Sequence, residues 1–306
     1  MEVYYQGTDI TDMVRVNSCI VRDTAGGRCD SLEIEFGNAA GWYSWGPEED
    51  NKIIVAHSGY DSGIMYVNKI LPEDGKFRIL ATSLPCGARS KANASFINRT
   101  IEEIMRACAA VSGMDYQIIG IDPQIVIPYI ERNDEGCAAF LDRLLTLESA
   151  ALKCLDGKFM AIGYEYVQNR NPSQIVTLSA NQEGAKYRRD GTSYKKLTIK
   201  TPYAGATAKD EAVTESHMQL VISGTLPVMN NIHAGRWARG KLFSLNRQCE
   251  SLVMGNTFNA GLTAMTRIDI DGDTDATGEW IVDEVEHDMI NLTTTATMRR
   301  CIWSIR

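Results

Sequence analysis

The chain has 306 residues, of which 44% are hydrophobic and 23% charged, a globular rather than a disordered composition. Its formal net charge of −8 argues against binding nucleic acid by general phosphate neutralisation. No stretch approaches the ~18 uninterrupted apolar residues of a membrane span. Residues 1–6 lack the basic start and apolar run of a secretory signal. We therefore expect a soluble protein that folds in a cytoplasm.

The eight cysteines show no C-x-x-C spacing, which argues against zinc-ribbon, zinc-finger and redox motifs. Cys108 and Cys137 fall on the apolar phase of predicted helices, where a reduced cysteine behaves as a small hydrophobic residue. We expect structural thiols.

The first ~85 residues are patterned as strands and turns. A strand is predicted over 31–36, where every second side chain is apolar, and others over 53–55 and 64–70. Asp74-Gly75 suits the type I′ turn of a hairpin that continues through 77–81. This part of the chain is predicted to be all β.

One loop in this region carries three aromatic residues, Trp42, Tyr43 and Trp45, between two glycines. Strand patterning does not explain all three. Exposed, they would anchor a protein interface or form a carbohydrate platform, and covered, they would belong to the core. Interface and core are both open interpretations, and sugar binding is the weaker third.

The period changes to that of a helix after residue 88. Thr100 and Glu103 form a capping-box signature ahead of an apolar stripe, and Gly113 is placed to end that helix. A second helix is predicted to start near 133–134, followed by a short hairpin that turns at Asp156-Gly157. This segment is predicted to be a compact α+β unit.

The remainder returns to strands, with one helix predicted over 234–246. A threonine-rich segment, 292–298, has the β-branched alternation of an edge strand. No repeat of solenoid period is visible, although the two β portions could be copies of one design.

The chain offers few residues for catalysis. None of its four histidines stands in H-E-x-x-H, and G-x-S-x-G and phosphate-binding glycine loops are absent. A Ser-His-Asp triad assembled from distant positions stays open, because triads are defined by geometry. We interpret the histidines as surface or turn residues and nominate no catalytic or cofactor-binding residue.

Two charged clusters invite binding interpretations. The acids from Asp269 to Asp275 resemble a calcium loop, but an EF-hand counted from Asp271 has Ala276 and Val282 where glycine and glutamate are required. An acidic hairpin tip fits better, with only weak metal binding left open, so no metal ligand is nominated. The basic residues of 187–196 could face an acidic partner or nucleic acid, but a solvated charge cluster is favoured.

The last ~75 residues carry a family resemblance. A helix with Arg236-Trp237 leads to Asn259-Ala260-Gly261-Leu262, then to an acidic turn, the strand 278–288 and a threonine-rich strand ending in Arg299-Arg300. This order resembles the C-terminal half of baseplate hub proteins of contractile phage tails, the late-control-D-like family. Hub regions of type VI secretion spikes and tail-like bacteriocins are similar. The helix–helix–hairpin segment resembles the family's insert, whereas the first ~85 residues match only as a generic barrel half.

The resemblance implies an α+β, mainly β fold with two tube-type β-barrel domains, 1–88 and 169–306, the second with one helix. A small helix–helix–hairpin insert, 89–168, separates them. Three subunits would present six similar barrels, a ring that could stack on a sixfold tail tube while its true threefold symmetry matches a trimeric spike. No fused spike or lysozyme module is visible, so a separate spike protein is expected.

The implied function is structural and not enzymatic: a homotrimeric baseplate hub that adapts the tail tube to the central spike. The implied partners are the tube and spike proteins, the tape-measure protein and the baseplate wedge proteins, without a cofactor, a membrane or specific nucleic acid. The implied location is the host cytoplasm during assembly and then the baseplate of a virion or tail-like particle. Two alternatives stay open: the hub portion of a non-contractile tail-tip protein, and a tail-associated cell-wall hydrolase.

Overall fold

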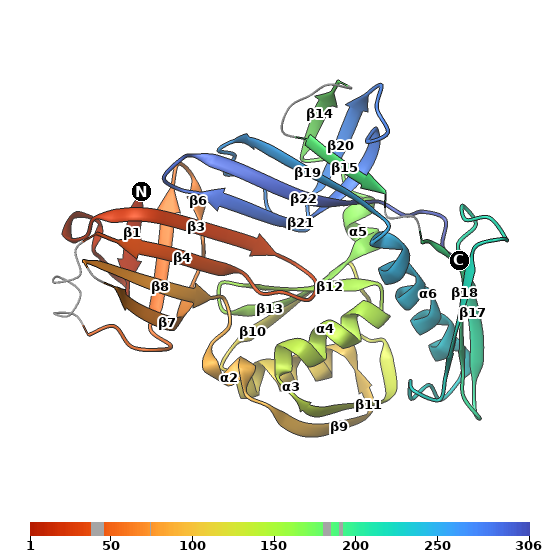
Figure 1. Ribbon diagram of the computed structural model, residues 1–306. Coiled ribbons are helices and arrows are strands. Elements are labelled where there is room, and N and C mark those ends of the chain that lie inside the picture. The colour runs from red at the N-terminus through yellow and green to blue at the C-terminus, as the bar shows by residue number, and fades with distance from the viewer. Residues whose placement is uncertain (38–45, 74, 180–184, 190–191) are drawn as a thin grey trace.

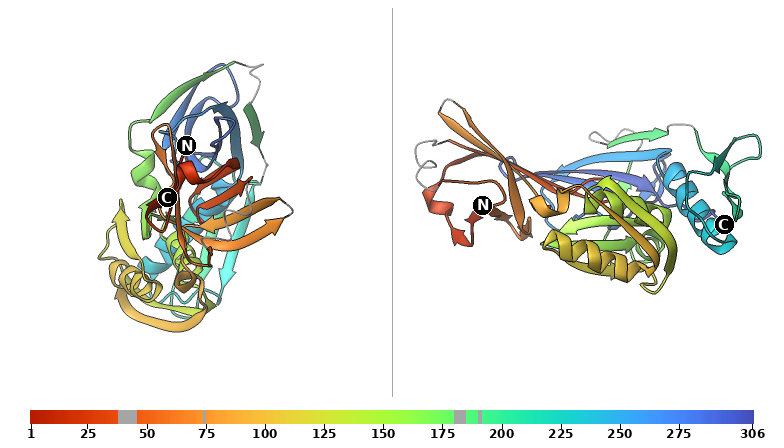
Figure 2. Two further views of the ribbon diagram at one scale, coloured as in Figure 1. Left: turned by 90° about the vertical axis from the view of Figure 1, so that its left-hand side faces the viewer. Right: turned by 90° about the horizontal axis from the view of Figure 1, so that it is seen from below.

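A computed structural model describes residues 1–306 except 38–45, 74, 180–184 and 190–191. The fold is α+β and mainly β (Figure 1). A long twisted sheet runs through the molecule, an α+β unit packs against it, and a three-stranded sheet with one long helix lies at the far end. Figure 2 shows an elongated molecule with the two termini near opposite ends.

The long sheet has fourteen strands, in the order β15-β19-β22-β21-β3-β4-β8-β7-β5-β1-β2, with β20 beside β21, β14 beside β20, and β6 beside β5. Its N-terminal strands, joined by the 3-10 helix η1 (Thr11–Met13), are β1 (Glu2–Tyr5), β2 (Thr8–Asp9), β3 (Val16–Thr24), β4 (Ser31–Phe36), β5 (Lys52–His57), β6 (Tyr60–Asp61), β7 (Met65–Glu73) and β8 (Lys76–Thr82). Its C-terminal strands are β14 (Gln174–Leu178), β15 (Ala185–Arg189), β19 (Glu250–Thr257), β20 (Arg267–Gly272), β21 (Gly278–Asp288) and β22 (Thr293–Arg300). The first and last parts of the chain therefore share one sheet.

Between these parts lies the α+β unit. A ribbon of β9 and β11 and a three-stranded sheet, β10-β13-β12, enclose helices α3 and α4. Its elements are α2 (Cys86–Arg89), β9 (Ala92–Thr100), α3 (Ile101–Ser112), β10 (Asp115–Ile119), β11 (Val126–Glu135), α4 (Cys137–Leu147), β12 (Ala150–Leu155), β13 (Lys158–Gly163) and α5 (Tyr164–Gln168). The predicted helix–helix–hairpin order is confirmed.

Local signals in this unit act as expected. Thr100 and Glu103 form both hydrogen bonds of the capping box, and Gly113 ends α3 in the left-handed conformation. Asp156 and Gly157 both have positive φ, as a type I′ turn requires. The predicted start of the second helix was wrong, because residues 133–135 continue β11, and α4 begins only at Cys137.

At the far end, helix α6 covers one face of a small sheet. The elements are β16 (Tyr194–Lys200), β17 (Gly205–Lys209), β18 (Met218–Ser223) and α6 (Asn231–Arg247). Helix α6 buries Trp237 and Leu242 in the same apolar core as the insert helices. The helix is therefore the packing element that connects the small sheet to the insert.

Two larger cores lie against the long sheet, in addition to a smaller cluster that includes Met265 and Ile281. Residues of β3, β4, β5, β7 and β8 form one, and residues of β19, β20, β21 and β22 form the other. The threonine-rich strand β22 lies between β19 and β21, so the edge-strand prediction was wrong. Thr294, Ala296 and Met298 face this core, and the alternation of 292–298 reflects one buried face rather than a free edge.

The two β portions repeat one design. In β7, Asn68 is an extra residue that shifts the pairing with β8, and in β21, Asp283 shifts the pairing with β22 in the same way. Before each bulge the strand has a second neighbour: β5 contacts Tyr66, and β20 contacts Ile281. Residues 50–73 therefore match 265–288 at one constant spacing in the sequence.

The backbone contacts beside each bulge match as well. The amide of Asp50 donates to the carbonyl of Val67 over 2.8 Å, and the amide of Met265 donates to the carbonyl of Val282 over 2.8 Å. Asp50 and Met265 both have positive φ, of 67° and 64°. An unusual backbone conformation that recurs at matched positions supports an internal duplication of structure.

Candidate assembly surfaces

The aromatic residues nominated from the sequence, Trp42, Tyr43 and Trp45, lie outside the described residues. Their interface role stays a prediction.

Strand β21 joins the two β portions by changing its neighbour at the bulge. Before Asp283 it pairs with β20, and from Glu284 to Asp288 it pairs antiparallel with β3. The carbonyl of Asp283 accepts a hydrogen bond from the Ala25 amide over 3.0 Å, and its carboxylate pairs with Arg247 of α6. The bulge thus aims one acid at a helix while the strand passes from one sheet portion to the next.

Ion pairs cross this junction on the exposed face. Arg22 of β3 lies 2.8 Å from Glu286 of β21, and Arg28 lies 3.0 Å from Glu284. Partly exposed pairs of this kind contribute little to stability, but opposite charges on facing strands favour one register over others.

Several strand edges have no neighbour in the part of the chain that the structure describes, and two of them lie on β7 and β15. Strand β7 pairs with β5 only at Met65 and Tyr66, so its outer edge is free from Lys69 to Glu73. Strand β15 pairs with β19 on one side and ends the sheet on the other. Free edges carry unpaired backbone donors and acceptors, so they are either protected or used for pairing.

A buried polar group connects the N-terminal sheet to the insert. Lys153 of β12 forms an ion pair with Asp23 of β3, and both side chains are about 95% buried. Nearby, Asp30 is 1% exposed and accepts a hydrogen bond from the Thr24 amide over 2.8 Å. Burial raises the pKa of Asp30 to about 7. This group holds the two units together by charge rather than by apolar contact alone.

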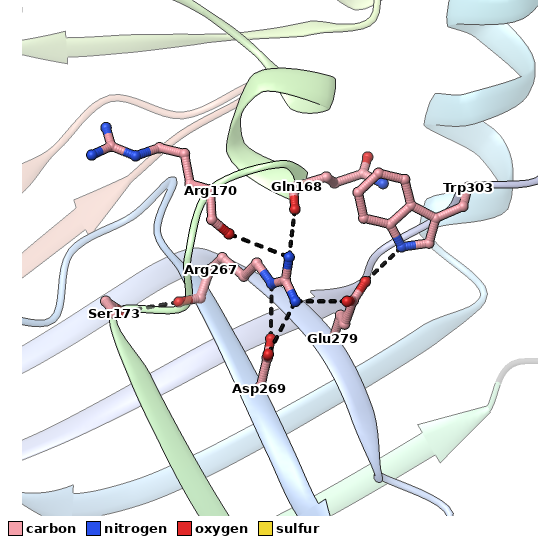
Figure 3. Close-up of polar contacts among 7 residues, drawn as sticks. All are labelled: Gln168, Arg170, Ser173, Arg267, Asp269, Glu279 and Trp303. Carbon is pink, nitrogen blue, oxygen red and sulfur yellow. Dashed lines mark hydrogen bonds and ion pairs between the residues drawn. The ribbon is translucent and has the colours of Figure 1, made fainter.

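A second polar cluster, drawn in Figure 3, surrounds Arg267 on β20. Its guanidinium donates to the Gln168 carbonyl over 2.6 Å, to Asp269 over 2.8 Å and to Glu279 over 2.6 Å. Glu279 in turn accepts a hydrogen bond from the indole N–H of Trp303 over 2.6 Å. Trp303 is nevertheless 53% exposed. The cluster fixes α5, the β20–β21 hairpin and the C-terminal segment to one another.

Exposed apolar side chains gather beside the start of α6. Tyr203 and Ile232 are each 80% exposed and Met229 is 54% exposed. The Gly205 amide donates to the Asn231 side chain over 3.1 Å, so the β16–β17 loop and the helix start are adjacent. Such a group is a candidate contact surface for another protein.

The structure corrects the interpretation of the histidines. His233 and His287 are 1% and 0% exposed, so they are core residues rather than surface or turn residues. Burial lowers the pKa of His233 to about 4 and also lowers the pKa of His287. His287 contacts Thr294 and the Leu262 carbonyl over 3.0 and 3.2 Å, which is a structural role inside the sheet.

Some members of the two charged clusters form ion pairs with other parts of the chain. Asp269 is held by Arg267, and Arg189 lies 3.7 Å from Glu250. Lys195 is 5% exposed and lies 3.7 Å from Glu211. Across the described residues, no three His, Cys, Asp or Glu side chains are grouped so that they could hold a metal ion.

One mostly apolar cavity of about 630 Å³ lies between α2, α4 and β12. Its lining includes Leu84, Leu152 and Asp142, and burial raises the pKa of Asp142.

No helix in the described part of the chain combines the length and apolar character needed to cross a membrane.

No protein-family model and no curated protein sequence matches the chain. Its structure is similar to a tail protein from Neisseria meningitidis, with a TM-score of 0.78 and 11% identity over 99% of this chain and 97% of that one. It is also similar to the 43 kDa tail protein of prophage MuSo2 from Shewanella oneidensis, with a TM-score of 0.76 and 13% identity over 98% of each chain.

A third similar structure is an Escherichia coli component of the type VI secretion system. That protein is described as structurally similar to the bacteriophage T4 tail proteins gp27 and gp5. The TM-score is 0.59 and the identity 14%, over 98% of this chain and 77% of that one. The chain therefore has the fold of phage tail proteins related to gp27, and the resemblance seen in the sequence is confirmed at the level of the fold.

The junction at β21 and the free edges of β7 and β15 were not predicted from the sequence. A signal was present, because Ile53, Gly63 and Val67 recur as Ile268, Gly278 and Val282 at one spacing. Three identities in a segment of this length are too few to establish a repeat without the matching bulges.

Proposed function

We propose that this chain is a structural component of a phage tail or tail-like particle and not an enzyme. The observation that supports this most is the shared fold with tail proteins over nearly the whole chain. The polar clusters of the described residues fit a structural role, because their charges are engaged in holding elements together. No reaction is needed to account for them.

More specifically, we propose a homotrimeric baseplate hub that joins a sixfold tail tube to a trimeric spike. The repeated strand design supports two tube-type units per chain, within the domains 1–88 and 169–306, on either side of the insert 89–168. Three chains would then offer six similar units to the tube and three equal surfaces to the spike. A contractile particle is the first candidate, and the tip of a non-contractile tail the second.

Light scattering tests this proposal. The purified chain should have the mass of three copies, and adding the candidate spike should give one spike trimer per three chains. A single-copy mass in the presence and absence of the spike would contradict the hub role. Clearing of cell wall by the purified chain on zymography would instead favour the hydrolase alternative.

The aromatic loop provides a second test. If Trp42, Tyr43 and Trp45 contact a neighbouring subunit or partner, replacing all three with alanine should weaken assembly at least tenfold, since buried aromatic anchors dominate interfaces. The control is Val111→Ala, at an apolar residue of α3 that is 67% exposed and lies outside the candidate surfaces. Assembly of the triple variant at the wild-type concentration would remove the interface interpretation.

A further inference from the structure

The repeated strands pair in the same way within each β portion, but the neighbours at their outer edges differ. Strand β21 has β3 as its neighbour after the bulge, whereas β7, which matches β21, has none there among the described residues. The matched stretch is Lys69 to Glu73. The pairing of β21 with β3 therefore shows what kind of strand could pair with the free edge of β7.

Strand β15 likewise has an unpaired outer edge among the described residues. Tyr187 pairs with Leu252, which pairs with Met298 opposite Val282. In the other half, Val21 of β3 pairs with Leu32, which pairs with Ala81 opposite Val67. Strand β15 thus takes the place of β3, and among the described residues it has no counterpart of the outer neighbour that β3 has in β21.

We infer that the free half of β7 pairs antiparallel with β15 of a second copy of this chain, in the register that β21 and β3 adopt within one copy. The inference rests on the proposed ring assembly and names the strands that close it. Because each copy offers one β7 and one β15, the contact is head-to-tail and can form a closed ring. The matching register places Leu71 opposite Arg188 and Glu73 opposite Lys186 of the next copy.

Charge supports this choice of partner. Strand β15 carries Lys186, Arg188 and Arg189, and the first two have no ion pair in the described part of the chain. Pairing β15 with another β15 would oppose like charges. In the inferred register, Glu73, which lies 2.9 Å from Arg78 of its own copy, also faces Lys186 and lies diagonal to Arg188, so the acidic end of β7 meets the basic strand.

Pro72 matches His287 and would face Tyr187 of the next copy. It has no amide hydrogen, so the ladder loses one donor there, although its carbonyl can still accept. Proline also discourages pairing of a free edge with unrelated strands. The paired stretch is therefore short, and correct partners depend on the flanking charges.

Charge reversal tests the register. Glu73→Lys and Lys186→Glu should each raise the dissociation constant of self-association roughly five- to tenfold, and the double variant should restore it. Asp12→Lys is the control, because it makes the same charge change at an exposed acid outside the ladder. Additive weakening in the double variant would overturn the inferred contact.

Engineered cysteines separate this inference from the proposed function. Leu71→Cys with Arg188→Cys should give disulfide-linked multimers on a non-reducing gel. Leu71→Cys with Tyr187→Cys, shifted by one residue, should not, because neighbouring side chains point to opposite faces. Arg22→Cys with Glu286→Cys is the positive control within one copy, and the single variants account for the native thiols.

The outcomes are distinct when the mass is measured on the same samples. A trimer with the predicted cross-link supports the inference. A trimer that cross-links only in the shifted pair, or in neither, overturns the β7–β15 contact and leaves the hub proposal standing. A monomer under all conditions, with the spike present, contradicts both.

Discussion

At the scale of single residues, buried charge determines how the units of this chain are held together. Asp23, Asp30 and Lys153 share one dry site between β3 and β12. Burial is the main reason that the pKa of Asp30 rises to about 7; the nearby Asp23 adds to the rise, and Lys153 opposes it. The sequence gives no indication of this site, because its members are far apart in the chain.

The raised pKa predicts a pH dependence of stability. The folded protein holds the Asp30 proton up to about pH 7, whereas the unfolded chain releases it near pH 4. The contribution of Asp30 to stability is therefore complete below pH 4 and is lost as the pH rises to 7. Asp30→Asn should remove this loss, so its unfolding free energy relative to the natural protein should increase by at least about 1 kcal/mol from pH 5 to 8.

Urea denaturation at fixed pH values measures this difference. Asp12→Asn, the same substitution at an exposed acid, is the control for this difference. If Asp30→Asn behaved in the same way, Asp30 would titrate normally in the folded protein.

At the scale of elements, the insert contacts the small sheet and its helix where α4 and α6 approach closely. A Cβ at Gly240 of α6 would lie 2.1 Å from the Leu147 carbonyl at the end of α4. A Cβ at Gly235 of the same helix would lie 3.7 Å from its nearest neighbour, Ala206. Packing therefore requires a glycine at position 240 but not at position 235.

This contrast predicts opposite effects of one substitution. Gly240→Ala should destabilise the protein by roughly 2–3 kcal/mol, because the helices must separate to admit the methyl group. Gly235→Ala should stabilise it by up to about 1 kcal/mol, because alanine is the better helix former. Thermal unfolding of the two variants side by side measures both, and equal effects would contradict the close approach of α6 and α4.

At the scale of the whole molecule, the two β portions expected from the sequence share one continuous sheet. Strand β21 belongs to both, and among the described residues β15 ends the sheet while part of β7 has an unpaired edge. If these edges pair between copies, assembly changes the environment of a few backbone amides and leaves the rest of the sheet unchanged.

Hydrogen exchange can observe this change. The amides of Ile70, Tyr187 and Arg189 match positions that are bonded in the β21–β3 ladder, so they should exchange fast in the monomer and at least tenfold more slowly in the assembled particle. The amides of residues 284–288, paired within each copy, should exchange equally slowly in both states. Fast exchange of Ile70 after assembly would contradict pairing at this edge.

Patterns of neighbouring residues determined the local structure of this protein. The capping box at Thr100 and Glu103, the turn at Asp156-Gly157 and the alternation in 31–36 depend only on nearby residues, so they were predictable. The fold class and the resemblance to tail proteins followed from the order of such elements. The burial of His233 and His287 was not predictable in this way, since it depends on distant strands and helices.

Only the tertiary structure decided which strands are neighbours and which edges stay free. Whether 292–298 forms an edge or an interior strand depends on the positions of β19 and β21, which local patterning does not specify. The change of partner at Asp283 and the matching vacancy beside β7 likewise depend on long-range pairing. A strand's own sequence sets which face it buries, but its neighbours are chosen by the packing of the whole sheet.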